Sequence, residues 1–145
     1  CYTHRRLLAQ TALQLIADGK NQKAINILKK ADVEIPAYNV TLDYMSGGLD
    51  MARGWLLTGQ KAKGKEYVEA VWKNAHQYLD YYLSLPNDRF LQSQNDCIRQ
   101  IMIMQSVCDV AGMVSPQLQK SYEKQLNALY TLYRGRGGSM PKGNQ

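Results

Sequence analysis

The side chains that most often carry out chemistry are sparse in this sequence. His4 and His76 are the only histidines among the 145 residues. Neither has a partner residue at the spacing of a metal site, and no Ser/His/Asp or Cys/His order suggests a nucleophile with its base. We expect surface or packing roles for both. The sequence thus predicts no catalytic, cofactor-binding or metal-binding residue, and we do not expect an enzyme.

One pair of carboxylates has the spacing of an acid–base pair. Glu66 and Glu69 are three residues apart, which places both on one face of a helix. Lys65 and Lys73 surround them, and Glu69 precedes Lys73 by four residues, in the favourable order for an ion pair. We therefore interpret this face as solvated ion pairs rather than as a catalytic dyad.

The three cysteines are Cys1, Cys97 and Cys108. Cys97 and Cys108 are 11 residues apart. On one continuous helix this spacing separates them by about 16 Å, whereas a disulfide needs Cα atoms within about 7 Å. We expect these two thiols to be small buried side chains that do not pair with each other. The cysteines do not indicate whether the protein resides in an oxidising or a reducing compartment.

The net charge of +6 comes from 18 Lys and Arg against 12 Asp and Glu. Half of this excess lies in residues 134–145, which contain Arg134, Arg136 and Lys142 and no acid. Nucleic-acid-binding domains carry their basic residues on a folded face, so we do not expect a nucleic-acid partner. Because the same segment is poor in bulky apolar residues, we predict a folded domain at 1–133 and a disordered, basic, glycine-rich tail at 134–145.

Apolar residues recur at helical spacing along most of the chain, and no stretch is a convincing strand. Glycines and prolines end the periodic segments, as expected at helix boundaries. The predicted helices cover residues 5–18, 22–35, about 42–57, about 62–84, about 88–111 and 116 to about 133. We predict an all-α fold in which these six helices form three antiparallel hairpins.

Two of these helices have unusual features. Gly47 and Gly48 fall inside the third helix, where they weaken it and indicate the close approach of another helix. The fifth helix contains the longest apolar run, residues 101–104, and its periodicity places Ile98, Met102 and Gln105 on one side with the apolar residues. That run is far shorter than the roughly 20 residues of a membrane span, so none is expected.

Gly19 and Gly59 lie 40 residues apart, and each separates the first helix of a hairpin from the second. A period of this length is typical of helical repeat arrays. The first hairpin matches the tetratricopeptide pattern at Leu8, Ala12, Leu15, Gly19, Ala24, Leu28, Ala31 and Pro36. The second hairpin matches less well and the third only weakly. We expect a tetratricopeptide-like right-handed array with an atypical last helix as a cap.

In arrays of this kind the first helix of each hairpin lines a concave groove. The pattern places Arg6, Gln10 and Leu13 there from the first helix, and Asp50 and Arg53 from the third. Two arginines can hold a carboxylate by bidentate hydrogen bonds, although the chain lacks the dense Lys and Asn set of carboxylate-clamp members. We predict that this face contacts a protein or peptide.

The chain has ten tyrosines, of which Tyr78, Tyr81 and Tyr82 gather near the end of the fourth helix. One interpretation is packing, with the hydroxyls reaching solvent or backbone carbonyls. The other is an aromatic patch for a partner, because tyrosine is enriched at protein interfaces.

The first hairpin, Tyr44 in the connector and the run LDYYLSLP at residues 79–86 together resemble the C-terminal region of a family of bacterial membrane proteins. That family, typical of Bacteroidetes, is of unknown function, and its many-spanning N-terminal part is similar to protein O-mannosyltransferases. The resemblance covers about residues 5–133. It implies a soluble helical module tethered to the bacterial inner membrane, on the periplasmic side, with any catalytic residues outside this chain.

Two functions are consistent with these features. The first is a non-catalytic protein–protein interaction or scaffold module, the C-terminal fragment of a larger membrane protein. Its partner would be a protein or peptide, including the membrane-embedded part of its own parent chain. The alternative is an accessory domain of a membrane glycosyltransferase that contributes to acceptor or glycan binding. A groove that combines exposed aromatic faces with carboxylates would favour the alternative.

Overall fold

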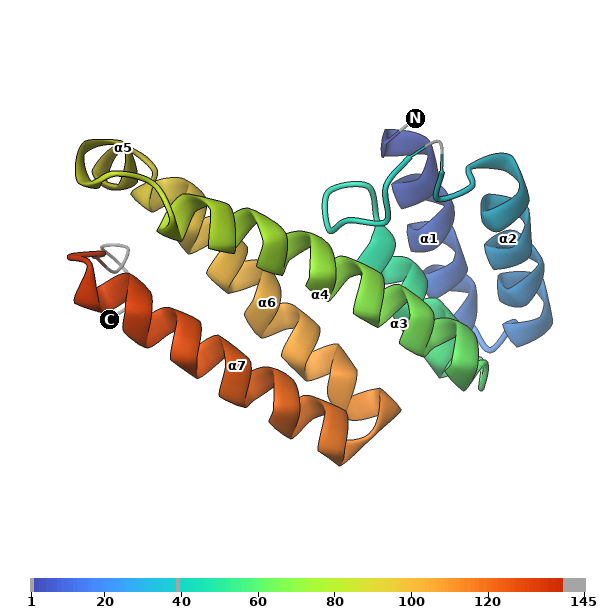
Figure 1. The fold of residues 1–145 in the computed structure, drawn as a ribbon. Helices are drawn as coiled ribbons and strands as arrows, with labels where there is room; N and C mark the ends of the chain where they lie inside the picture. The colour runs from blue at the N-terminus through green and yellow to red at the C-terminus, as the bar shows by residue number, and fades with distance from the viewer. Residues whose placement is uncertain (1, 39, 140–145) are drawn as a thin grey trace.

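The computed structural model describes residues 2–38 and 40–139, and these residues fold into helices without any strand (Figure 1). The helices are α1 (Tyr2–Ala17), α2 (Asn21–Glu34), α3 (Gly48–Leu57), α4 (Lys61–Leu83), α5 (Asn87–Gln92), α6 (Gln94–Val114) and α7 (Pro116–Gly135). The prediction of an all-α fold is confirmed.

Several predicted helix boundaries are also confirmed. Gly19 and Gly59 follow α1 and α3 with φ angles of +78° and +83°, a left-handed conformation that glycine adopts without strain. The hydroxyl of Ser115 accepts a hydrogen bond from the Leu118 amide at 3.1 Å, and Pro116 is the first residue of α7. Together they form the N-terminal cap that the Ser-Pro pair predicts.

The third helix begins later than predicted, at Gly48 rather than near residue 42. Gly47 has φ +88°, which no residue inside a right-handed helix adopts, and residues before it form turns. The expected close approach is nevertheless present. A Cβ atom on Gly47 would lie 2.7 Å from the Cα atom of Arg6 in α1. Gly47 therefore allows α1 to pack closely on the start of α3, and Gly48 gives the same room to Val71 of α4.

The fifth predicted helix is divided at Ser93 into α5 and α6. The Ser93 hydroxyl donates a hydrogen bond to the carbonyl of Arg89 at 2.8 Å, and its backbone has φ −99° and ψ 9°. The same bond to the carbonyl four residues earlier forms at Thr11 and Thr131 within unbroken helices, so it accompanies the break but does not by itself cause it. Phe90 of α5 is fully buried in the core.

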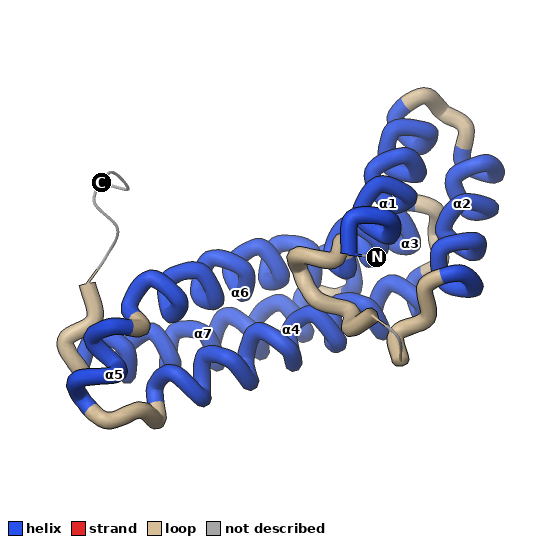
Figure 2. The backbone as a smooth tube through the Cα atoms, turned by 90° about the horizontal axis from the view of Figure 1, so that it is seen from above, coloured by secondary structure: helices blue, strands red, loops and turns tan. Residues whose placement is uncertain are grey.

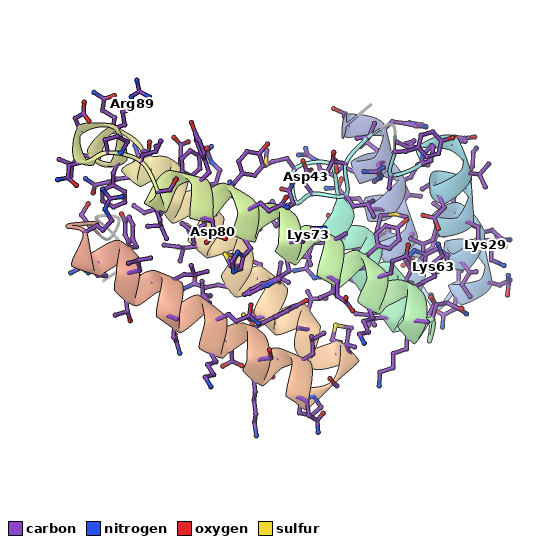
Figure 3. All side chains as sticks on the ribbon, in the orientation of Figure 1. Lys29, Asp43, Lys63, Lys73, Asp80 and Arg89 are labelled. Carbon is purple, nitrogen blue, oxygen red and sulfur yellow. The ribbon has the colours of Figure 1, made fainter. Side chains whose placement is uncertain are left out.

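The three longest helices, α4, α6 and α7, lie side by side, and α6 runs antiparallel to both α4 and α7 (Figures 1 and 2). α1 and α2 form a shorter hairpin at the end where α4 begins. α3 lies between these two parts and contacts α1, α2, α4 and α6. An ion pair of 2.9 Å between Lys63 on α4 and Asp32 on α2 also joins the two parts (Figure 3).

The N-terminal part packs through small side chains. Its buried alanines are Ala9, Ala12, Ala24, Ala31 and Ala52. A Cβ atom on Gly54 of α3 would lie 3.0 Å from Leu28 of α2, and one on Gly64 of α4 would meet Leu56 of α3. Helices with small residues at their contacts approach closely, as the repeat pattern predicts for this hairpin.

The C-terminal part packs through large side chains. Trp72 on α4 stacks on Tyr122 on α7, with ring centroids 4.0 Å apart and planes within 6°. Phe90 and Tyr133 form an edge-to-face pair with ring centroids 5.9 Å apart. Such aromatic pairs stabilise a fold beyond the apolar area that they bury.

The predicted disordered tail begins too early at residue 134. α7 continues to Gly135, and Arg136 donates to the carbonyl of Leu83 at 2.6 Å and to the side chain of Asn87 at 2.9 Å. The Tyr133 hydroxyl donates to the carbonyl of Ser139 at 2.7 Å. Residues 134–139 thus belong to the folded domain because polar contacts and the ring of Phe90 hold them; residues 140–145 lie outside the described part.

α6 is the one helix in the described residues that is long and apolar enough to cross a membrane by length and composition. However, 56% of its most apolar stretch is buried inside the fold. α6 contacts α3, α4 and α7, and a helix that packs on several neighbours is apolar for that reason.

Candidate functional site

The segment between α2 and α3 carries two exposed apolar side chains at its turn, Tyr44 and Met45. Their exposed fractions are 42% and 57%. This segment has no regular secondary structure, so its position depends on side-chain hydrogen bonds rather than on a helical ladder.

Arg5 on α1 fixes this segment. Its guanidinium is 1% exposed and donates to the carbonyls of Ile35 at 2.8 Å, Val40 at 2.6 Å and Thr41 at 2.9 Å. It also donates to the hydroxyl of Ser46 at 3.1 Å. One side chain therefore provides hydrogen-bond donors to a carbonyl at the end of α2 and to three acceptors in the segment between α2 and α3. These bonds hold Tyr44 and Met45 in place.

The charge of Arg5 is balanced at a distance rather than by a direct ion pair. Burial lowers the pKa of the guanidinium, and the nearby carboxylates Asp43 and Asp32 raise it. Arginine stays protonated in proteins, so the four acceptors and the charges of Asp43 and Asp32 offset the cost of burying this charge.

Ser46 completes the network and is itself buried. Its hydroxyl donates to the carbonyl of Thr41 at 2.8 Å, and its amide donates to the carboxylate of Asp43 at 2.7 Å. These bonds close the turn that exposes Tyr44 and Met45. Neither Arg5 nor Ser46 is among the predicted site residues, because their partners are backbone carbonyls distant in the sequence.

Three of the five predicted groove residues meet in one cavity. Arg6, Gln10 and Asp50 line a hollow of about 180 Å³ together with Tyr44, Met45 and Leu49. The other two predicted residues do not line it: Leu13 is half-buried, and Arg53 forms an ion pair with Asp50 at 2.9 Å. Arg6 and Arg53 therefore do not form a two-arginine carboxylate site in this structure.

The predicted aromatic patch is partly a cavity wall. Tyr82 lies between Tyr78 and Tyr81, with ring centroids 6.4 Å and 5.5 Å away. Tyr78 and Tyr82 line a second cavity of about 240 Å³, whose polar residues include Asp43, Asn74 and Arg99. Tyr81 is exposed and lies outside the residues that line it. Burial, followed by the charge of Asp96, raises the pKa of Tyr82.

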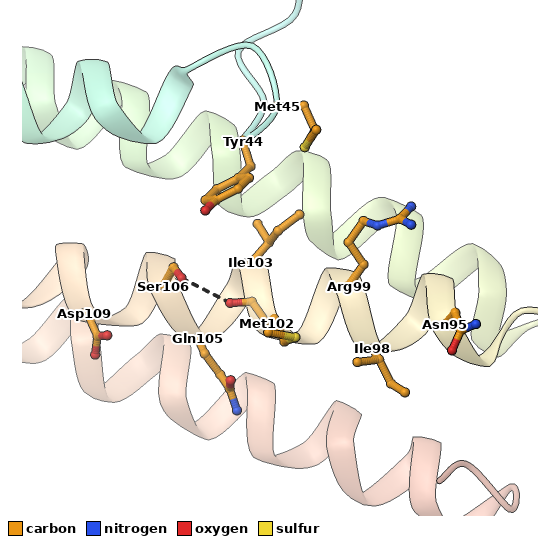
Figure 4. A pocket seen from close by; sticks show the side chains of 10 residues that line it. All are labelled: Tyr44, Met45, Asn95, Ile98, Arg99, Met102, Ile103, Gln105, Ser106 and Asp109. Carbon is orange, nitrogen blue, oxygen red and sulfur yellow. Dashed lines mark hydrogen bonds between the residues drawn. The ribbon is translucent and has the colours of Figure 1, made fainter. Parts of the chain in front are cut away.

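A third hollow, of about 560 Å³, runs along α6 beside Tyr44 and Met45 (Figure 4). Its floor includes Ile98, Met102 and Gln105. Sequence periodicity grouped these three with the apolar side of the helix, but Met102 and Gln105 are exposed and Ile98 is half-buried. α4 and α7 cover other sides of α6, and the methionine and glutamine lie on the open side.

The three cavities share Tyr44 and Met45, so they form one continuous concave face. α1, α3, α4 and α6 each contribute side chains to it. We call it the concave face. The predicted site residues lie at its two ends, the groove residues on α1 and α3 and the tyrosines on α4, and none of them lies at its centre on α6. The stripe on α6 at helical spacing is the signal that could have found it.

The residues considered for chemistry have structural partners. His76 lies 2.8 Å from Asp80, His4 lies 3.5 Å from Glu34, and Lys65 pairs with Glu69 at 3.7 Å. The structure thus pairs Glu69 with the lysine before it rather than with Lys73. Within residues 2–38 and 40–139, no group of three or more His, Cys, Asp or Glu side chains could hold a metal ion.

Cys97 and Cys108 are both buried in α6 and unpaired, as their spacing predicts. Burial raises the pKa of each thiol to about 11. Because the thiolate is the reactive form, neither thiol is a nucleophile near neutral pH.

Comparisons with known proteins give no match to this chain: no family model matches it, and no curated protein or solved structure matches it significantly.

Proposed function

We propose that the chain is a non-catalytic interaction module that binds a segment of another protein on its concave face. The observation that carries the proposal is that three cavities on one face share two exposed apolar residues, Tyr44 and Met45. Exposed apolar surface on a folded domain marks binding sites more often than chance, and methionine adapts to varied partners.

We also propose that the hairpins form a tetratricopeptide-like right-handed array. The helix contacts support this arrangement. α3 packs against both helices of the preceding hairpin, α1 and α2, and α6 packs against both α3 and α4. In stacked repeats each unit buries its apolar surface on its neighbour in this way. The concave face then corresponds to the first helices, α1, α3 and α6.

The chemistry of the face suggests what it binds. Tyr44 and Met45 offer an apolar centre, and Arg6 and Gln10 offer hydrogen-bond donors at the α1 end. A polypeptide segment with one apolar side chain and free backbone carbonyls or a carboxylate complements both.

Capture experiments with matched variants test this function. Wild-type protein is immobilised and exposed to detergent-solubilised membranes and soluble extract of its own organism. The groove variant carries Tyr44→Ser and Met45→Ser. The control carries Val33→Ser and Tyr38→Ser, which remove side chains 81% and 88% exposed that line none of the three cavities. Proteins retained by wild type and control but lost from the groove variant support the proposal. Retention on the groove variant, or no retention on wild type, contradicts it.

The cavity beside the aromatic patch favours a second candidate, an accessory domain that binds a glycan. Tyr78 and Tyr82 offer ring faces for the C–H surface of a sugar, while Asp43 and Asn74 offer hydrogen-bond partners for its hydroxyls. Titration of mannose oligosaccharides monitored by NMR tests it. Tyr78→Ala should abolish binding, whereas Tyr81→Ala, outside the cavity, should retain it; no saturable binding to wild type excludes these sugars as ligands.

We propose attachment to a membrane protein only because residues 5–133 resemble the C-terminal region of the bacterial membrane protein family. The resemblance places the module after a glycosyltransferase-like membrane part, on the periplasmic side. Recovery of the parent's membrane-embedded part in the capture experiment would support this context, and protease access to the module in spheroplasts would establish its side. Protection from protease in intact spheroplasts would contradict it.

A further inference from the structure

The open side of α6 carries a continuous stripe of side chains at helical spacing. We call it the α6 stripe; its residues are Asn95, Arg99, Met102, Ser106, Asp109 and Met113. Alternating steps of four and three residues keep the stripe on one face over about 27 Å. All six are exposed except Ser106, which is half-buried. The stripe is therefore free to meet another surface.

The two charges of the stripe are placed symmetrically. Arg99 and Asp109 are ten residues apart on a continuous helix, which is about 15 Å. Arg99 has only a long contact of 3.4 Å with Asp96, and its side chain is 62% exposed. Asp109 is exposed and forms no ion pair with any residue in the described part of the chain.

This symmetry makes the stripe complementary to itself. A two-fold axis perpendicular to α6 at the level of Met104 places Arg99 of each copy opposite Asp109 of the other. The same axis makes the two helices antiparallel. A parallel pair would instead place Arg99 against Arg99 and Asp109 against Asp109, which like-charge repulsion disfavours.

We propose that the α6 stripe is an interface between two copies of this chain, which pack antiparallel across it. The inference rests on the proposed function, since it names a second copy as a partner of the concave face. A second copy is favoured over an unrelated helix because it supplies both charges at the required spacing and in the required order.

Two further observations agree with this interface. Met102 on the stripe is 49% exposed, and Met45 overhangs it, so the contact includes apolar area as well as charge (Figure 4). α4 and α7 both run antiparallel to α6, and an α6 helix from a second copy would have the same relative direction (Figure 1). An antiparallel neighbour is also favoured by the helix dipole. A single helix stripe is a small interface, so the dimer is weak and reversible.

Sedimentation equilibrium with charge-reversed variants tests the proposal. Over about 1 µM to about 1 mM protein, the wild-type mass should rise from 16.5 kDa toward twice that value. Arg99→Glu and Asp109→Lys each turn two attractive contacts into two repulsive ones, so each should raise the dissociation constant by about tenfold or more. The double variant exchanges the two charges and should return to within about threefold of wild type.

Lys29→Glu is the matched control, because it reverses an exposed charge on α2, far from the stripe (Figure 3). It should associate like wild type, and circular dichroism should show equal helix content in all variants. A mass of 16.5 kDa at every concentration overturns the interface. So does weakening by the single variants without recovery in the double variant. The capture of other proteins is tested separately, with the Tyr44 and Met45 variants, so a failure of the dimer does not decide the proposed function.

Discussion

The two halves of the molecule are stabilised by different means. α1, α2 and α3 make their closest contacts at alanines and glycines, enclose one buried arginine and also bury Leu28, Met51 and Trp55, whereas α4, α6 and α7 pack mainly through large aromatic and aliphatic side chains. Small residues bring backbones together but bury little apolar area. The N-terminal half therefore combines apolar burial with polar bonds and close backbone contact, whereas the C-terminal half depends mainly on apolar burial.

The concave face lies where these halves meet. Tyr44 and Met45 are positioned by hydrogen bonds within the N-terminal half, yet they overhang α6 of the C-terminal half. Changes to the N-terminal half should therefore displace Tyr44 and Met45, whereas changes to the C-terminal half should lower stability and leave these two residues in place.

The largest effect is expected for Arg5→Ala. It removes the donors to three carbonyls and to the Ser46 hydroxyl, all in a buried or half-buried setting. Unsatisfied buried acceptors and the lost packing should reduce the free energy of unfolding by about 3–5 kcal/mol, measured by urea denaturation. Amide hydrogen exchange in residues 40–46 should also accelerate.

The neighbouring residue provides the control. Arg6 carries the same charge on the same helix but is exposed, so Arg6→Ala should change stability by less than about 0.5 kcal/mol. Equal effects of the two substitutions would show that helix propensity or net charge, rather than the buried network, accounts for the loss.

A smaller effect is expected for Gly47→Ala. The positive φ angle strains any other residue, and the new Cβ would lie 2.7 Å from the backbone Cα of Arg6, which cannot rotate away. We expect a loss of about 2–3 kcal/mol in thermal or urea unfolding.

Gly19→Ala separates the two causes. Gly19 has φ +78°, but a Cβ atom there meets nothing within 4 Å. This substitution should cost only about 1 kcal/mol, the backbone strain alone. If both alanines cost the same, α1 and α3 have room to move apart, and the close contact contributes nothing to stability.

Local signals in the sequence were sufficient to predict most helix boundaries. Gly19, Gly59 and the Ser115–Pro116 pair act through backbone geometry within a few residues, and the structure has them where the pattern predicts. Burial of Ala24 and Leu28 in the first hairpin likewise follows from periodicity. These features need no knowledge of distant contacts.

The centre of the candidate site depends on distant contacts, which explains why it was missed. Arginine is usually exposed, and only the folded chain brings carbonyls some 30 residues away to Arg5. Met102 is apolar and lies in an apolar run, but the neighbouring helices α3, α4 and α7 leave one side of α6 open. The helical pattern continues through Ser93, so the break there has no local signal in the sequence.

The buried thiols of the C-terminal half predict a dependence on alkaline pH. The pKa of Cys97 and of Cys108 rises from 9.0 to about 11 on folding, because burial disfavours the thiolate. Between pH 9 and pH 11 the unfolded chain releases thiol protons that the native state retains. The stabilising contribution is complete below pH 9 and is lost as the pH rises, by about 2 kcal/mol per thiol at pH 11.

The double variant Cys97→Ala, Cys108→Ala isolates the contribution of the two thiols to the pH dependence of the free energy of unfolding. Urea unfolding of wild type and variant at several pH values should give a constant offset below pH 8 and converging stabilities toward pH 11. Parallel curves across the whole range would mean that the two thiols titrate alike in the folded and unfolded chains, and that burial in α6 does not affect them.

The smallest effect is expected for Arg136→Ala, which tests where the C-terminal half ends. Arg136 bonds Leu83 and Asn87 and lies 4.4 Å from the ring centroid of Phe90, so it ties the residues after α7 to α5. Since it is half-exposed, its loss should cost about 1 kcal/mol, seen as a lower melting temperature and faster hydrogen exchange in α5. Lys124→Ala on the exposed surface of α7 is the control and should change neither quantity. If Arg136→Ala behaves like the control, the folded domain ends with α7, and the contacts of residues 136–139 do not contribute to its stability.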